Sequence, residues 1–159
     1  MFKVNGITNA KKKLDRSKKD LDRLVAKRVQ LAAQYVHISV TSLTAVWMGT
    51  SLANWIWSVN SPSGIFKGAS GTGAPGLTSQ MSLGEEPRRA ANQAVADASF
   101  KSIKFNPKDP YHCFYLSNND PKISAMEAGR VPDSSRARTS DMVKMTHRGL
   151  IDYINSMRI

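Results

Sequence analysis

Few side chains in this sequence have the types and spacing needed to make or break bonds. The three histidines, His37, His112 and His147, show no i, i+4 pairing that would set two metal ligands on one helix face. Cys113 adjoins His112, but neighbouring side chains of a strand point to opposite faces, so a nucleophilic Cys/His pair would need a distant partner such as His147. The pattern does not favour nucleophilic catalysis.

The acidic residues and the glycine-rich segment also lack the pattern of a reactive site. The carboxylates are scattered, at Asp97, Asp109, Asp120, Glu127 and Asp141, without the spacing typical of a metal or glycosidase site. The segment "GASGTGAPG" has the glycines of a phosphate cradle, but no Gly-Lys-Ser/Thr follows it. We therefore expect a protein that is not an enzyme and that holds no metal and no cofactor.

Positive charge is the strongest feature of the composition. The net charge is +11, and much of it lies early in the chain, at Lys11, Lys12, Lys13, Arg16, Lys18, Lys19, Arg23, Lys27 and Arg28. Such a field attracts nucleic acid or an acidic protein surface, although many charge runs are simply solvated helix faces. No zinc spacing, RNA-binding aromatic motif or helix-turn-helix pattern indicates base-specific recognition.

Length and apolar content predict one soluble intracellular domain spanning residues 1–159. The single cysteine excludes an internal disulfide framework and fits a reducing compartment. The N-terminus has no apolar core of a secretory signal. The most apolar run, residues 46–59, is interrupted by Gly49 and polar residues and is shorter than the roughly 18 residues that cross a bilayer. No membrane association is expected.

A long basic helix is predicted over residues 10–42, after an N-terminal arm of residues 1–9. Apolar residues recur at three- and four-residue intervals without Pro or Gly, at Leu14, Leu21, Leu24, Leu31, Tyr35 and Ile38. We expect the second half of this helix to pack in the core. The first half is expected to lie along another subunit or along something negatively charged.

Two strands and three further helices complete the predicted order. Trp55 and Trp57 alternate with Ile56 and Ser58, which predicts a half-buried strand after a turn at Gly49. Residues 60–81 are predicted to form a flexible Gly/Ser/Pro loop. A helix ending near residue 101 is predicted to lay an alanine face on the sheet, at Ala91, Ala94, Val95 and Ala98.

Phe114 and Leu116 belong to a second strand, followed by a short helix that begins at Pro121 and is closed by Gly129. A polar loop is predicted over residues 130–139, followed by a last helix whose buried side is predicted to carry Val143, Leu150, Ile154 and Met157, with Thr146 or His147 between them. The fold class is α+β: a long N-terminal helix and two further helices packed on a small, mainly antiparallel sheet, with a long Gly-rich loop.

Two stretches resemble a known family. "LSNNDPKISAMEAGR" is similar to the N-x-x-P-Y-A-x-x-L-E-x-G segment of neck and tail-completion proteins of tailed bacteriophages, with Asn118, Pro121, Glu127 and Gly129 in register. "VWMGTSLANWIWSVNSP" resembles that family's V-x-T-G-x-L-x-x-x-W segment, and "MVKMT" resembles the start of its final helix. Lys122 and Ala128 stand where the family usually has aromatics, and Met48 stands where it usually has threonine.

The resemblance implies a structural virion protein that forms a homo-oligomeric ring, hexameric or dodecameric, at the head–tail junction. A neck, connector, tail-completion or terminator protein of this kind joins portal, adaptor and tail proteins and surrounds the DNA, which it contacts without sequence specificity. It would assemble in the host cytoplasm and remain in the virion. The alternative is a small basic nucleic-acid-binding protein that uses its N-terminal helix.

The sequence thus predicts two sets of residues, a candidate interface and a structural core. Besides the nine early basic residues, the candidate subunit or partner interface contains Phe66, Asn118, Asn119, Pro121, Glu127, Gly129 and Arg130. Within it, Glu127 could be a buried acid, but we favour a charge paired with Arg130 or with a neighbouring subunit. The predicted structural core contains Gly49, Trp55, Trp57, Phe114 and Leu116.

Overall fold

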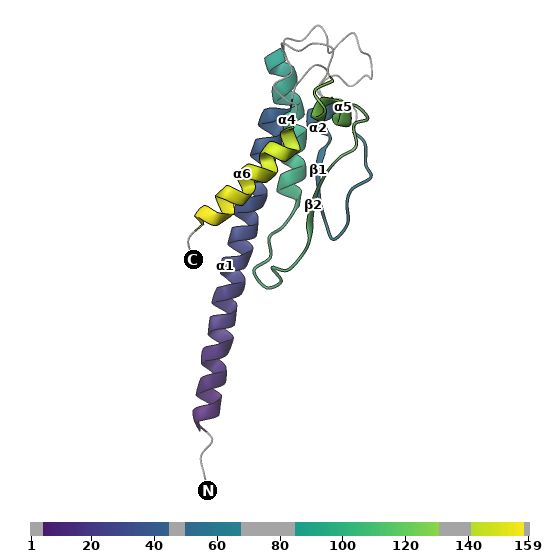
Figure 1. Cartoon of the computed structure of the whole chain (residues 1–159). Coiled ribbons are helices and arrows are strands. Elements are labelled where there is room, and N and C mark those ends of the chain that lie inside the picture. The colour runs from purple at the N-terminus through teal and green to yellow at the C-terminus, as the bar shows by residue number, and fades with distance from the viewer. Residues whose placement is uncertain (1–4, 45–49, 68–84, 131–140, 158–159) are drawn as a thin grey trace.

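The computed structural model describes residues 5–44, 50–67, 85–130 and 141–157, and it has the predicted α+β fold. Its elements are α1 (Asn5–Leu43), α2 (Thr50–Ala53), β1 (Trp55–Val59), α4 (Glu85–Ser102), β2 (Phe114–Asn118), α5 (Ile123–Glu127) and α6 (Met142–Ser156). Figure 1 shows α1 running the length of the molecule, with the other elements gathered around its C-terminal half. Because α1 begins at Asn5, residues 5–9 belong to the helix and not to the predicted arm.

The sheet consists of β1 and β2, which pair antiparallel as predicted, with Trp55 opposite Asn118 and Val59 opposite Phe114. Trp55, Ile56 and Trp57 are all buried, so the prediction of a half-buried β1 is wrong. Both α2 and α4 contact this strand, and the backbone N–H of Trp57 donates to Ser99 Oγ of α4. The strand is therefore enclosed on both faces.

The tryptophans belong to the core, as predicted, whereas Phe114 and Leu116 are half-buried. Leu116 packs against a cluster of Val40, Leu52, Trp55 and Ala96. Phe114 contacts Phe105, with ring centroids 4.8 Å apart. Gly49 lies outside the described residues.

The buried face of α4 is not the predicted alanine face, and two of its three buried residues are polar. Asn92, Ala96 and Ser99 are buried, while Ala94 and Ala98 are exposed. Spacings of four and three residues put the three buried positions on one helix face. Burial of Ser99 is tolerated because its hydroxyl accepts the amide hydrogen of β1.

Hydrogen bonds from two other elements fix the C-terminal end of α1. The guanidinium of Arg89 in α4 donates to the carbonyl oxygens of Thr41 and Thr44, at 3.3 and 3.0 Å. Trp55 Nε1 donates to Thr44 Oγ1 at 2.8 Å. The two Arg89 bonds satisfy carbonyls that the end of a helix otherwise leaves without partners, and the Trp55 bond satisfies a buried hydroxyl.

Helix α6 packs on the body end of α1 through a stacked tyrosine pair. The rings of Tyr35 and Tyr153 lie 4.9 Å apart and nearly parallel. A Cβ on Gly149 would collide with the Tyr35 hydroxyl, so glycine permits this close approach. Met142 and Thr146 are the buried residues of α6, whereas the predicted Val143 and Ile154 are exposed.

Candidate functional site

The side chains that could do chemistry are not brought together. His37 is buried in α1, His112 lies beside β2 and pairs with Asp109 at 3.0 Å, and His147 is exposed on α6. Cys113 is an exposed free thiol. Within the part of the chain that the structure describes, no group of three His, Cys, Asp or Glu side chains could hold a metal ion.

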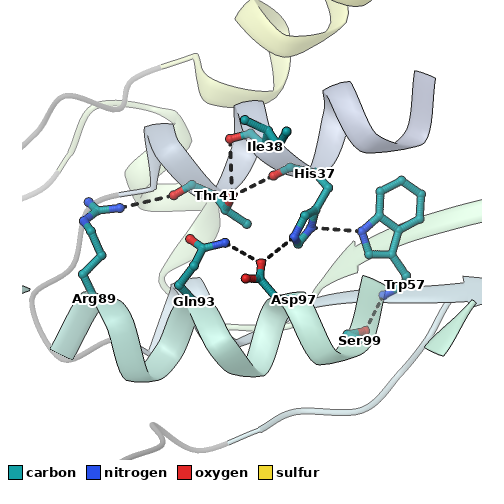
Figure 2. A network of polar contacts seen from close by, with 8 residues as sticks. All are labelled: His37, Ile38, Thr41, Trp57, Arg89, Gln93, Asp97 and Ser99. Atoms are coloured by element: carbon teal, nitrogen blue, oxygen red, sulfur yellow. Dashed lines mark hydrogen bonds and ion pairs between the residues drawn. The ribbon is translucent and has the colours of Figure 1, made fainter. Parts of the chain in front are cut away.

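A partly buried network of hydrogen bonds surrounds His37 (Figure 2). His37 Nε2 donates to Asp97 Oδ1 of α4 at 2.8 Å, and Trp57 Nε1 of β1 donates to His37 Nδ1 at 3.3 Å. Gln93 donates to the same carboxylate oxygen at 2.8 Å. Since Nδ1 accepts a hydrogen bond, this arrangement assigns the imidazole proton to Nε2.

The His37–Asp97 pair is structural. Both ring nitrogens are occupied by partners within the chain, and Phe100 stacks on the imidazole with centroids 4.8 Å apart. Burial pushes the pKa of Asp97 upward, but the hydrogen bonds from His37 and Gln93, with the charge of Lys101, bring it below its ordinary value. The network therefore joins α1, α4 and β1.

Side-chain amides hold a surface segment over the end of the sheet. Asn119 Nδ2 donates to the carbonyls of Ser63 and Ile65, at 2.7 and 2.9 Å. The fully buried Asn54 accepts from the N–H of Lys67 and donates to its carbonyl. We call Asn54, Asn119 and the residues 63–67 that they hold the asparagine clamp.

The asparagine clamp presents two apolar side chains to solvent. Ile65 is 60% exposed and Phe66 is 53% exposed. Because backbone hydrogen bonds on either side hold this segment, these side chains occupy defined positions, which lowers the entropy lost when a partner covers them. Phe66, a residue that the sequence nominated, thus joins Asn119 in one surface.

Asn118 and Asp120 fix the turn after β2. Asn118 Nδ2 donates to the carbonyl of Ser51 at 2.8 Å, and Ser51 Oγ donates to Asp120 Oδ2 at 2.6 Å. Asp120, which is buried, also accepts the N–H of Lys122. Sequence reasoning missed Asp120 because its partner is 69 residues away in the chain.

Gly129 and Glu127 have structural roles at the end of α5. Gly129 has φ 68°, and the N–H groups of Gly129 and Arg130 donate to the carbonyls of Met126 and Ala125, which forms a Schellman motif. Glu127 does not make the predicted ion pair with Arg130. Its carboxylate accepts the N–H of Val143, at 3.1 and 3.2 Å, and so caps the start of α6.

The N-terminal part of α1 projects from the body (Figure 1), and we call residues 7–24 the projecting half. Leu14, Leu21 and Leu24 are exposed there, and the predicted basic residues surround them. The part of α1 that was expected to lie along a partner is therefore not packed on its own chain. The side of α1 that faces the body carries Asp22 and Ala26 instead. Asp22 Oδ1 accepts a hydrogen bond from the Tyr111 hydroxyl at 3.2 Å.

A basic cleft lies between α1 and the loop before β2. It has a volume of about 520 Å³ and is lined by Asp15, Lys18, Lys19, Asp22, Arg23, Pro107 and Lys108. Four cationic side chains against two carboxylates give the cleft a net positive charge. A phosphate group is a chemically suitable occupant.

The nominated residues therefore form separate surfaces and no single site. Phe66 and Asn119 belong to the asparagine clamp, and Asn118 fixes the turn after β2. Glu127 links α5 to α6, Gly129 ends α5, and the basic residues follow α1. Pro121 and Arg130 are exposed. No described helix is both long and apolar enough to cross a membrane.

Comparison of the chain with protein-family models, with curated proteins and with solved structures gives no match in any of the three. The contacts and exposed surfaces of the chain itself are therefore the basis for a functional interpretation.

Proposed function

We propose that this chain is a structural virion protein of a tailed bacteriophage, which forms a ring at the head–tail junction and joins portal-side proteins to the tail. The observation that carries the proposal is the use made of the segment that resembles the phage family. Asn118 and Asn119 hold neighbouring backbone segments, and Glu127 caps α6. Polar side chains that position surfaces, with no reacting partner, suit a protein that works by assembly.

The exposed surfaces fit a ring. The exposed pair Ile65 and Phe66 belongs to the asparagine clamp, beside the end of the sheet where β1 begins and β2 ends. The projecting half of α1 extends away from the body (Figure 1). If Ile65 and Phe66 contact a different surface on the body of the next subunit, the contacts are head-to-tail and close into a ring when the rotation between neighbours permits it. Hexameric and dodecameric rings are the expected forms.

Charge supports a place around DNA. The net charge of +11 gives each subunit an attraction for phosphate that requires no base contacts. In a ring, these charges add around a common channel. The DNA would be held without sequence specificity and would move through the lumen.

The size of the assembled particle tests this function. Light scattering on the purified chain is expected to give a hexamer or dodecamer, and Phe66→Ser is expected to shift it to monomers because the residue is exposed at the asparagine clamp. Ile154→Ser, at a similarly exposed apolar position on α6, is the matched control and should assemble normally. A chain that remains monomeric and is absent from virions would exclude the proposal.

The basic cleft favours a second candidate, a small nucleic-acid-binding protein. Lys18, Lys19, Arg23 and Lys108 line a cavity large enough for a phosphodiester. If this is the function, duplex DNA should bind a monomer or dimer, and the logarithm of affinity should fall linearly with the logarithm of salt, by roughly 0.9 per phosphate neutralised. Lys19→Ser/Lys108→Ser would then reduce both the affinity and this slope.

A further inference from the structure

The projecting half of α1 carries an apolar stripe with heptad spacing. Ile7, Leu14 and Leu21 recur every seven residues, and Leu24 follows three residues after Leu21. Their exposed fractions are 70%, 71%, 55% and 41%. Seven residues make about two helical turns, so the four side chains line one side of the helix, as positions a and d of a coiled coil do.

Within the body, the same line of α1 is already covered by a helix. Tyr35 continues the seven-residue series from Leu21 by way of Arg28, and its ring stacks on Tyr153 of α6. Figure 1 shows α6 crossing α1 at this level, above the projecting half. The stripe therefore continues an existing helix–helix interface, and a second helix is the occupant that its spacing fits.

The charges beside the stripe oppose pairing with a second copy of the chain. Lys11 and Lys18 follow one edge of the stripe, and Lys13 and Lys27 follow the other. In a parallel pair, Lys13 of one copy would meet Lys18 of the other, and in an antiparallel pair each lysine edge would face its own equivalent.

One acidic residue, Asp20, lies among the lysines on these edges, but it does not offset their positive charge. Asp20 already pairs with Arg23 of its own helix at 3.8 Å. Over residues 7–28 there are nine Lys and Arg residues against three Asp residues, so two such helices would repel along their whole length.

We propose that this stripe docks an acidic amphipathic helix of a different protein. The apolar seam of that helix would cover Ile7, Leu14, Leu21 and Leu24, and its Glu or Asp flanks would lie against the lysine edges. The inference does not rest on the head–tail function. It specifies the chemistry of one partner, which a ring of any size could recruit.

The test uses the full-length chain and designed peptides of four heptads. The first peptide has Leu at positions a and d and Glu at e and g; the second keeps the Glu residues but has Ser at a and d; the third keeps Leu but has Lys at e and g. Binding is measured by titration calorimetry at about 0.15 M salt. The Debye length is then about 8 Å, so distant charges contribute little to the affinity. The first peptide is expected to bind at least about tenfold more tightly than the others, which is about 1.4 kcal/mol.

Matched variants assign that binding to the stripe. Leu14→Ser/Leu21→Ser should weaken binding of the first peptide at least about tenfold. Ile151→Ser/Ile154→Ser, which changes two exposed apolar residues of α6, should leave it unchanged. Circular dichroism checks that both variants keep the helix content, as expected for substitutions of exposed side chains.

Several results would overturn the inference. These are no binding of the first peptide, equal binding of the peptide with a Ser seam, and self-association or ring formation that depends on Leu14 and Leu21. Leucine-dependent binding to vesicles of phosphatidylglycerol and phosphatidylcholine, without peptide binding, would assign the stripe to a lipid surface instead. A monomeric chain that still binds the first peptide would exclude the ring and retain this inference.

Discussion

The two ends of α1 are parts of one helix in opposite environments. Residues 33–44, the body half, bury Ala33, His37, Val40 and Thr41 among partners from α4 and β1. The projecting half has the more regular leucine spacing, and its leucine side chains are exposed to solvent. Hydrophobic periodicity therefore identified the helix, but it did not indicate which side faces the body of its own chain.

This difference separates two uses of apolar residues. In the body half, small and polar side chains are buried because specific partners accept them, such as Asp97 for His37 and Trp55 for Thr44. In the projecting half, large aliphatic side chains contribute little to the stability of the isolated chain, since folding does not remove them from water. They are available to a partner.

The largest expected effect comes from a substitution in the body, beside the C-terminal end of α1. Trp55→Ala should lower the free energy of unfolding by about 3–5 kcal/mol, because it removes a buried indole at the point where β1 meets α1. Trp55→Phe, which keeps an aromatic ring but loses the hydrogen bond to Thr44, should cost less. Urea unfolding followed by circular dichroism measures both. Equal losses for the two variants would show that ring packing is not the main contribution.

A matched pair within α1 tests the comparison directly. Val40→Ala should cost about 2 kcal/mol, since Val40 is buried in the core cluster. Leu14→Ala, which deletes a larger side chain, should change the free energy of unfolding by less than about 0.5 kcal/mol because Leu14 is exposed. A loss above about 1 kcal/mol for Leu14→Ala would mean that the projecting half is buried in solution, as it would be in an oligomer.

Local signals made the elements predictable. The long helix, both strands and the left-handed Gly129 follow from period, β-propensity and capping rules, which depend on residues close in sequence. The packed faces of α4 and α6 were predicted only in part: Thr146 is buried, as one of the two alternatives expected there, but the structure also buries Asn92 and exposes Ala94 and Ile154. Whether a polar residue can be buried depends on partners that the sequence does not reveal.

For the candidate surfaces, the sequence predicted several of the residues but not the contacts that they make. Phe66, Asn118 and Asn119 were nominated, but the asparagine clamp depends on contacts such as Asn119 with Ser63, 56 residues apart. Glu127 was recognised as a charge near a helix end, yet the helix that it caps is α6 and not its own. The charge of the early basic residues and the apolar recurrence beside them were both visible in the sequence, and the first half of this helix was expected to lie along a partner.

A smaller effect concerns the helix that covers the body half. Glu127→Ala should cost about 1 kcal/mol, because the first N–H groups of α6 lose their acceptor. Glu127→Gln keeps an acceptor but removes the negative charge from the helix N-terminus, and should cost less. Thermal unfolding measures both changes. If Glu127→Ala leaves stability unaltered while assembly fails, the carboxylate contacts a neighbouring subunit and not α6.

The smallest effect is the pH dependence of the His37 network. Asp97 has a folded-state pKa below its ordinary value of 3.8, so its contribution to stability is fully present above that pH and is lost as the pH falls through the folded-state pKa. The stability difference between the wild type and Asp97→Asn should therefore be constant near neutral pH and shrink below about pH 4. The difference should be modest, because the Asp97 side chain is 41% exposed and solvent screens it.

The matched control lies in the projecting half. Asp20 and Arg23 form an ion pair in which both side chains are about three-quarters exposed, so Asp20→Asn should change stability little at any pH. Urea unfolding of the three proteins between pH 3 and pH 7 compares the two ends of α1 in one experiment. A difference that grows on acidification for Asp97→Asn would contradict the lowered pKa. A clear loss for Asp20→Asn would indicate that the projecting half is held by contacts beyond its own helix.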